Sequence, residues 1–251
     1  MKILEQNPDP KVVTDADFFK RITETKMPWR VTHIATGIEM LLVPPGTFMM
    51  GASPGDTQGD TQASDDEKPA HEVTITKAFY LGRTAVTQAQ WFKVMDTNPS
   101  DFRGESLPVD SVSWNDCRQF CAKTGMKLPT EAQWEYACRA GTKGATYGDL
   151  DLIAWHYGNA GYETHAVGEL QPNALGFFDM LGNVWEWCED RYGSYSSGSV
   201  TNPTGPATGS SLLLRGGYWS SNSDNCRASQ RYYYTPGDVY DFDGFRVVRT
   251  P

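Results

Sequence analysis

The first half of the chain alternates apolar stretches with glycine- and proline-rich breaks, a pattern that predicts short strands joined by loops. Residues 38–51 form two expected strands interrupted by Pro44-Pro45-Gly46, and residues 72–82 alternate well enough for a strand pair. Between them, residues 52–70 are polar and partly repetitive, so we expect a surface loop there. From residue 142 onward the chain is mostly loop, broken by short aromatic strands such as residues 183–188.

Helices are expected at four places in the chain. The predicted helices cover residues 16–22, 87–96, 113–125 and 129–141. Ser113 is suited to cap the start of one of them, and Thr130 with Gln133 forms a capping box at the start of another. Three longer helices beside many short strands favour an α+β domain with much irregular structure.

Composition and charge narrow the range of functions. Apolar residues make up 39% of the 251 residues, enough for a sizeable core in one large domain or two small ones. The formal net charge is −9 and no run of Lys or Arg stands out. Because nucleic acids and anionic membrane surfaces are bound through basic faces, neither is an expected partner.

The N-terminal sequence and the longest apolar runs bear on localisation. The start, MKILEQNPDPKVV, has no apolar core of the kind that a secretion signal carries, and no apolar run approaches 18 residues. We therefore expect no membrane span and a cytoplasmic protein as encoded, with surface display by another route left open.

Five cysteines occur at irregular spacing, an odd number that does not predict a disulfide framework. Cys117 and Cys121 lie one helical turn apart and could supply half of a metal site, but no second pair of ligands follows a matching pattern. Buried thiols are the expected state. The cysteines are Cys117, Cys121, Cys138, Cys188 and Cys226.

Seven stretches, taken in order, resemble the formylglycine-generating-enzyme family, also called the sulfatase-modifying-factor family. They are VPPGTFMMG, EKPAHEVTITKAFYLGRTAVTQAQW, LPVDSVSWNDCRQFC, KLPTEAQWEYACRAG, NALGFFDMLGNVWEWCED, LRGGYW and GFRVV, which together span roughly residues 38 to 248. The resemblance implies a loop-rich, single-domain fold related to the C-type lectin fold. We expect this domain to cover residues 37–251, after an N-terminal extension of residues 1–36 with a short helix.

The resemblance also allows a check on catalysis. The family's oxidases bind copper with two cysteines that follow the RGG motif, and these positions correspond here to Ser221 and Cys226. Because soft Cu(I) needs thiolate ligands, a serine at the first position removes the expected chemistry, and we predict no catalytic residues. A related iron-dependent branch uses a histidine-bearing helical domain, for which this chain has no room.

A calcium site of the family is partly retained in DMLGNVWE, and calcium is the one cofactor that the resemblance suggests. The matching ligands would be the side chains of Asp179 and Glu186 and the backbone carbonyls of Gly182 and Val184. The alternative is a Gly-Asn turn before a strand, with Glu186 paired to a basic neighbour.

Residues 215–248, here called the C-terminal segment, contain neither Lys nor Glu. Between family-like anchors such as Arg215, Trp219 and Arg231 lies a set of residues of four types only. Tyr gives large contact area at little entropy cost, and Ser, Asn and Asp give adaptable hydrogen bonds, so we expect a ligand-binding surface. The set is Tyr218, Ser220, Ser221, Asn222, Ser223, Asp224, Asn225, Ser229, Tyr232, Tyr233, Tyr234, Asp238, Tyr240, Asp241 and Asp243.

These four residue types can all arise from an AAC codon by changes at its adenines alone. The segment therefore resembles the variable region of proteins diversified by retroelements, in which a reverse transcriptase scrambles the adenines of a template. The resemblance implies a diversified protein that binds a protein or glycan ligand. A divergent metal-dependent oxidase and a fixed, non-catalytic adaptor domain are the alternatives, and the sequence leaves the oligomeric state open.

Three adjacent tyrosines, Tyr232 to Tyr234, favour the binding interpretation over an ordinary polar loop. Since side chains alternate across a strand, the three cannot all be buried on one side. At least one should be exposed, and exposed aromatic clusters usually mark binding surfaces.

Overall fold

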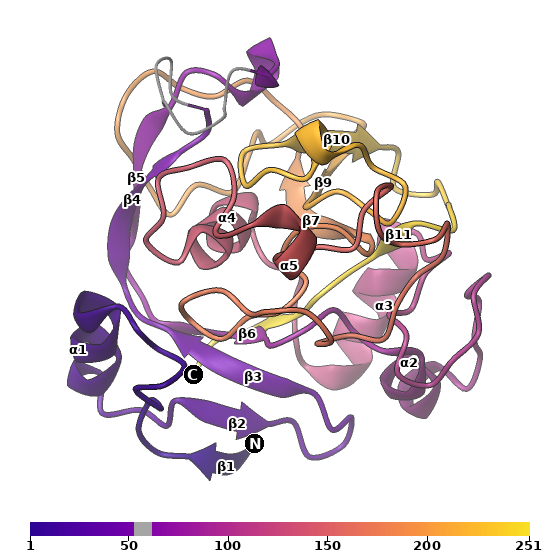
Figure 1. The fold of residues 1–251 in the computed structure, drawn as a ribbon, viewed down its shortest axis with the longest axis horizontal. Helices are drawn as coiled ribbons and strands as arrows, with labels where there is room; N and C mark the ends of the chain where they lie inside the picture. Colours follow the sequence, from indigo (N-terminus) through magenta and orange to yellow (C-terminus); the bar gives the residue numbers. More distant parts are fainter. Residues whose placement is uncertain (53–61) are drawn as a thin grey trace.

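A five-stranded antiparallel sheet joins the two ends of the chain in the computed structural model, which describes residues 1–52 and 62–251 (Figure 1). Part of the expected loop at residues 52–70, namely residues 53–61, therefore lies outside the described residues. In spatial order the strands are β1 (Lys2–Glu5), β2 (Arg30–Thr32), β3 (Glu39–Val43), β6 (Phe79–Gly82) and β12 (Val248–Arg249).

The N-terminal 36 residues are built into this sheet. The expected boundary between residues 36 and 37 falls between β2 and β3, which pair with Val31 opposite Met40. The separate extension that we expected is corrected accordingly, because its two strands continue the sheet of the domain. The expected short helix is present as α1 (Ala16–Glu24), which begins at the N-cap Asp15 and buries Phe18 and Ile22.

Two smaller sheets complete the β-structure. The four-stranded sheet contains β10 (Arg231–Tyr234), β9 (Leu212–Arg215), β7 (Trp185–Arg191) and β11 (Asp243–Gly244) in that spatial order, with β11 parallel to β7. The three-stranded sheet contains β4 (Gly46–Met50), β5 (His71–Ile75) and β8 (Val200–Thr201). The expected strands at 38–51 and 72–82 thus go to two different sheets.

Two helices begin at the caps that the sequence predicted, Ser113 and Thr130. Thr87, Ser113 and Thr130 each close a capping box, and Gly125 ends one helix in the left-handed conformation. Besides α1, the helical elements include α2 (Gln88–Met95), α3 (Trp114–Thr124), α4 (Glu131–Arg139), the short α5 (Leu150–Ile153), and 3-10 turns at Asp65–Glu67 and Ser223–Asn225. The α+β, loop-rich, single-domain architecture expected from the sequence is confirmed.

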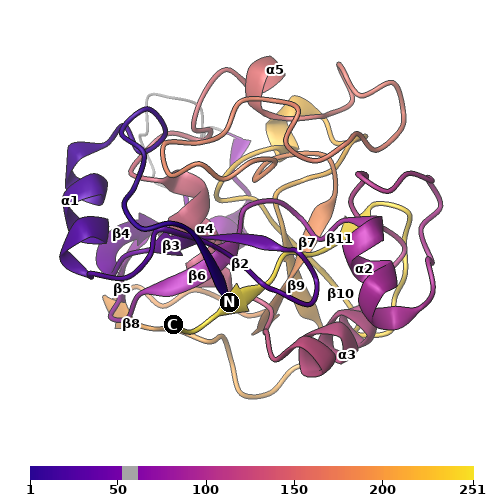
Figure 2. The ribbon, with the colours of Figure 1, turned by 90° about the horizontal axis from the view of Figure 1, so that it is seen from below.

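The helices pack around the sheets through aromatic contacts. Figure 2 shows α2 and α3 together on one side of the molecule, where Trp91 of α2 stacks on Phe120 of α3 at 5.5 Å. Phe245, which follows β11, packs edge-on against both rings. All five cysteines are buried free thiols, as expected. No helix in the described part of the chain is long and apolar enough to cross a membrane.

A candidate binding face built on two sides of one sheet

The register of the four-stranded sheet separates its side chains into two faces. Leu214 of β9 lies opposite Trp187 and Tyr232, whereas Arg215 lies opposite Glu186 and Arg231. Because neighbours along a strand point to opposite faces, ionic and aromatic side chains are sorted onto different sides. The aromatic side carries Trp185 and Trp187 from β7, Tyr232 and Tyr234 from β10, and Asp243, which lies opposite Trp185 in β11.

The ionic side is fastened to helix α4 by buried arginines. Arg215 donates to Glu131 at 2.9 Å and to Glu135 at 2.5 Å, and all three side chains are almost fully buried. Arg231 donates to Glu131 at 2.7 Å, and Arg139 donates to Glu135 at 2.8 Å. The guanidinium of Arg215 also lies 5.2 Å from the ring of Trp134. We call these five charged residues the ionic network.

The charges in this network stabilise one another. Burial alone would lower the pKa of Arg215, but the carboxylates of Glu135 and Glu131 outweigh burial and raise it. Burial would raise the pKa of Glu135, yet Arg139 and Arg215 hold it below its ordinary value. Arg215 and Glu135 therefore stay ionised at neutral pH, and the backbone of the C-terminal segment is held where it leaves β9 and enters β10.

The opposite side of the sheet continues into a connected group of rings, here called the aromatic face. Tyr232 stacks on Trp185 at 5.5 Å and meets Tyr234 at 5.0 Å, and Tyr234 meets Tyr240 at 4.5 Å. Tyr232 and Tyr240 remain 42% and 40% exposed, so rings reach solvent there. The aromatic face consists of Trp185, Tyr218, Trp219, Tyr232, Tyr234, Tyr240 and Phe242.

Tyr233 does not share this surface with its two neighbours. Its position opposite Leu213 places it on the ionic side, where its ring lies 4.1 Å from that of Tyr192 and stays half exposed. The three adjacent tyrosines therefore form two surfaces, two rings on one side of β10 and one on the other. The alternation of side chains along β10 explains this split. The pairing of Tyr232 with Leu214 and of Tyr233 with Leu213 decides which side of the sheet each ring takes.

The remaining positions of the four-residue set divide by burial. Asn222, Ser223, Asp224 and Asn225 are exposed on a 3-10 turn, and Ser220, Asp238 and Asp241 are half-buried. Ser221, Ser229 and Asp243 are buried, so they do not lie on the surface as the rest of the set does. Ser221 accepts a hydrogen bond from the N–H of Tyr218, and Ser229 accepts one from Arg227, which explains why both hydroxyls face inward.

Ser221 and Cys226, the two positions matched to the copper pair, converge on one glycine. A Cβ atom placed on Gly217 would lie 3.0 Å from the Sγ of Cys226 and 3.4 Å from the Oγ of Ser221. Burial raises the pKa of the Cys226 thiol to about 12, so the sulfur is protonated at neutral pH. The site thus holds one neutral thiol and one hydroxyl.

Comparison with known proteins matches this fold and its motifs to one family. The model of the sulfatase-modifying factor enzyme 1-like domain matches residues 26–251. The chain belongs to this family. The formylglycine-generating enzyme of Streptomyces coelicolor is 28% identical over 279 residues, which cover 82% of this chain and 87% of that protein.

Other proteins are similar to this chain over different shares of their own length. The serine/threonine-protein kinase pkn1 of Chlamydia pneumoniae is 30% identical over 84% of this chain, but the match spans only 38% of the kinase. Among solved structures, Treponema denticola variable protein 1 superposes with a TM-score of 0.77 at 27% identity, over 88% of this chain and 98% of that one. PvdO from Pseudomonas aeruginosa gives 0.75 at 28% identity over the same shares.

The residues matched to the family's calcium site suit calcium poorly here. Glu186 accepts two hydrogen bonds from Arg246, both at 2.6 Å, and a third from the indole of Trp134 at 2.7 Å. Gly182 and Asn183 form a positive-φ turn just before β7. The second carboxylate, Asp179, accepts one backbone N–H, and its Oδ1 has no partner among the described residues. Because a guanidinium already neutralises Glu186, the geometry matches the alternative of a turn followed by a paired glutamate.

Calcium should therefore leave the stability of the protein unchanged. A ligand that binds only the folded state raises the melting temperature, so the melting temperatures in millimolar CaCl2 and in EGTA should agree within about 1 °C. Differential scanning fluorimetry in the two buffers makes the measurement. A rise of several degrees with calcium that disappears in Asp179→Asn would show that a cation does bind these residues.

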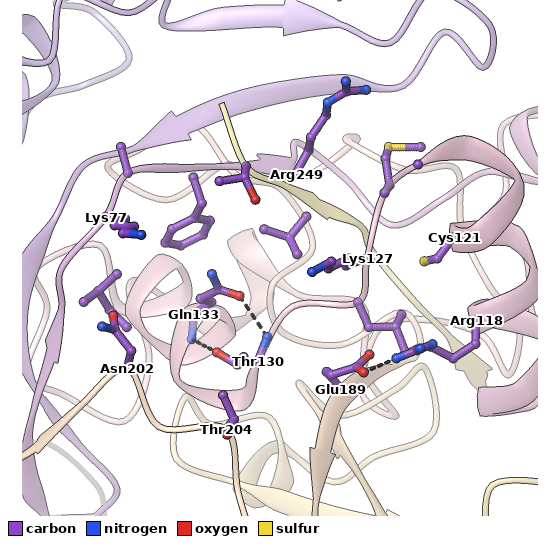
Figure 3. A pocket seen from close by; sticks show the side chains of 18 of the residues that line it. Lys77, Arg118, Cys121, Lys127, Thr130, Gln133, Glu189, Asn202, Thr204 and Arg249 are labelled. Atoms are coloured by element: carbon purple, nitrogen blue, oxygen red, sulfur yellow. Dashed lines mark hydrogen bonds and ion pairs between the residues drawn. The ribbon is translucent and has the colours of Figure 1, made fainter.

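A hollow of about 910 Å³ lies between β6, β12 and the start of α4 (Figure 3). Apolar side chains such as Phe79 and Met126 line it, together with the cations Lys77, Lys127 and Arg249. None of these three cations forms an ion pair within residues 1–52 and 62–251. Arg118 pairs with Glu189 at one end. Only Val248 of the C-terminal segment borders this hollow, so it forms no part of the aromatic face.

Proposed function

We propose that the chain is a ligand-binding protein whose C-terminal segment is diversified by a retroelement and displayed on the sulfatase-modifying-factor scaffold. One observation carries the proposal: residue type and exposure coincide in residues 215–248. Seven of the ten exposed positions are Tyr, Ser, Asn or Asp, against three of the fifteen buried positions. A variable surface over an invariant support would produce this division. The similarity to a structure named as a variable protein supports the same conclusion.

Recognition would work through the exposed rings and the polar side chains around them. Tyr232 and Tyr240 offer large, rigid contact areas, and a few such aromatics usually carry most of the binding energy of an interface. The polar turn at residues 222–225 supplies hydrogen-bonding groups that adapt to different ligands. The ionic network beneath the sheet would keep the backbone in place while the surface side chains change.

Sequencing the 3′ end of this gene in many sibling isolates tests the proposal. Substitutions should concentrate at the exposed members of the four-residue set, with a near-copy of the segment elsewhere in the genome that differs at adenines. Arg215, Gly217, Arg231 and Arg246 should not vary, because each is buried and holds the scaffold. A uniform 3′ end without a template copy would overturn the diversification proposal and favour a fixed adaptor domain.

We also propose that the chain is not an oxidase, because the copper pair lacks one thiol. Wild-type protein should retain no Cu(I) against a competing chelator, whereas Ser221→Cys should bind one Cu(I) per chain, since both side chains reach the same point near Gly217. Anaerobic titration measures the stoichiometry.

Ser220→Cys is the matched control for this titration, since it adds a thiol one residue away on a half-buried side chain. It should bind no more Cu(I) than wild type. Tight one-to-one binding by the wild-type chain would revive the metal-dependent oxidase as its function.

A further inference from the structure

A carboxyl group without a partner lies beneath the aromatic face. Asp243 is fully buried, and neither of its side-chain oxygens has a hydrogen-bond partner in the described part of the chain. Buried polar groups are nearly always satisfied, because leaving one unpaired costs free energy. Asp243 is also one of the positions in the four-residue set, so its presence invites an explanation in terms of a ligand.

The sheet register places this carboxyl among the rings. Asp243 lies opposite Trp185 in the parallel pair of β11 and β7, so both side chains leave the same side of the sheet. Trp185 stacks on Tyr232, and its ring centre lies 6.4 Å from that of Tyr218. The pKa values of Tyr218 and Tyr234 are raised mainly by burial, and the negative charge of Asp243 adds to both. The carboxyl is therefore close to two rings of the aromatic face.

Other carboxyl groups share this region without basic partners. Burial, together with the charges of Asp238 and Asp241, raises the pKa of Asp243 to about 8. Asp110, also fully buried, has an unpaired Oδ2, and burial with the charges of Asp101 and Asp241 raises its pKa to about 6. None of these side chains forms an ion pair with another described residue. The aromatic face thus adjoins several carboxyl groups that no cation of the described residues neutralises.

We propose, on the basis of the function proposed above, that the aromatic face binds a protein ligand through a Lys or Arg side chain that pairs with Asp243. A bound Lys or Arg cation would be stabilised by charge-assisted hydrogen bonds to the carboxylate and by cation–π attraction to the surrounding rings. A divalent metal suits the place less well, since no three acidic, His or Cys side chains of the described residues lie together as ligands.

The route to Asp243 passes between rings that are only half-buried. Phe242, the residue before Asp243, stacks on Tyr240 at 5.1 Å and lies 4.5 Å from Tyr218, so in the proposed complex these three rings would be the cover that a cation displaces. Rotation of interface side chains on binding is common, and it would open this cover without moving the backbone. The cationic head would then reach Asp243 while its aliphatic stem packs against the displaced rings.

A peptide selection tests the proposal with the intact chain. A phage-displayed library of random peptides is selected on wild-type protein, on Asp243→Asn and on the matched control Asp96→Asn, which replaces an exposed aspartate at the end of α2, outside the C-terminal segment. Peptides that require the aromatic face are identified by lost binding to Tyr232→Ala/Tyr240→Ala. Those selected on wild type and on Asp96→Asn should be enriched in Lys and Arg, and they should bind Asp243→Asn about 10- to 100-fold more weakly.

The pH dependence supplies a second readout. Asp243 must ionise to pair with a cation, so binding should strengthen as pH rises from 6 to 8 in wild type but not in Asp243→Asn. Face-dependent peptides without a Lys or Arg excess, or ones that bind Asp243→Asn equally well, would overturn the cation proposal and leave the binding function intact. A selection that yields no face-dependent peptide would count against both.

Discussion

Replacing Arg215 with alanine should lower the free energy of unfolding by about 3–5 kcal/mol, because the change removes one partner of a fully buried ionic network. Glu131 and Glu135 would each lose a buried cation, and Trp134 would lose the guanidinium packed on its ring. Urea unfolding at neutral pH, followed by tryptophan fluorescence, measures the loss. The free energy of unfolding of Arg215→Lys should lie between those of wild type and Arg215→Ala, since lysine keeps the charge but lacks the forked guanidinium that reaches both carboxylates.

An exposed ion pair provides the control for this prediction. Lys20 and Glu24 lie on α1 with most of both side chains in water, so Lys20→Ala should cost less than about 0.5 kcal/mol. If Arg215→Ala cost no more than Lys20→Ala, the network would not be holding the C-terminal segment to α4. The proposal that the ionic network keeps the backbone in place while the surface side chains change would then fail.

The double variant Tyr232→Ala/Tyr240→Ala should weaken binding of peptides selected on the wild-type chain by at least about 100-fold, because exposed aromatics at the centre of an interface carry most of its energy. The melting temperature should change little, since both rings already have large exposed fractions. Surface plasmon resonance and scanning fluorimetry make the two measurements on the same samples.

Phe92→Ala is the control for ring loss, since Phe92 is exposed on α2, outside the C-terminal segment. Binding should be unchanged in that variant. Tyr234 is left in place because its ring packs near Trp187, and its loss would confuse stability with recognition. A double variant that binds as well as wild type would mean that the ligand-binding surface lies elsewhere.

The local features of the fold could be predicted from sequence because their causes are local. Caps such as Ser113 and Thr130 act within four residues. Alternating apolar and polar positions predict a strand without reference to the strand with which it pairs. The sheet assignments could not be predicted, since β7, β9, β10 and β11 come from segments as far as 59 residues apart and nothing local sets their register. For the same reason the N-terminal strands were wrongly separated from the domain that they complete.

The candidate site was predictable in composition but not in orientation. The four residue types singled out the C-terminal segment as a candidate surface, yet they could not distinguish exposed Tyr232 from buried Ser229 or Asp243. The pairing of Glu186 with Arg246 likewise joins residues 60 positions apart. The hollow between β6, β12 and α4 gave no signal, because its lining comes from five separate stretches of chain.

The position of β10 at the outer edge of its sheet has a consequence for solubility. Edge strands rich in exposed aromatics tend to pair with other chains and aggregate. If the proposed diversification is limited to Tyr, Ser, Asn and Asp, it never introduces positive charge, and every variant keeps the acidity of the scaffold. Even if all four aspartates of the set became neutral, the net charge would move only from −9 to −5. Mutual repulsion would then keep copies apart whatever surface the edge strand displays.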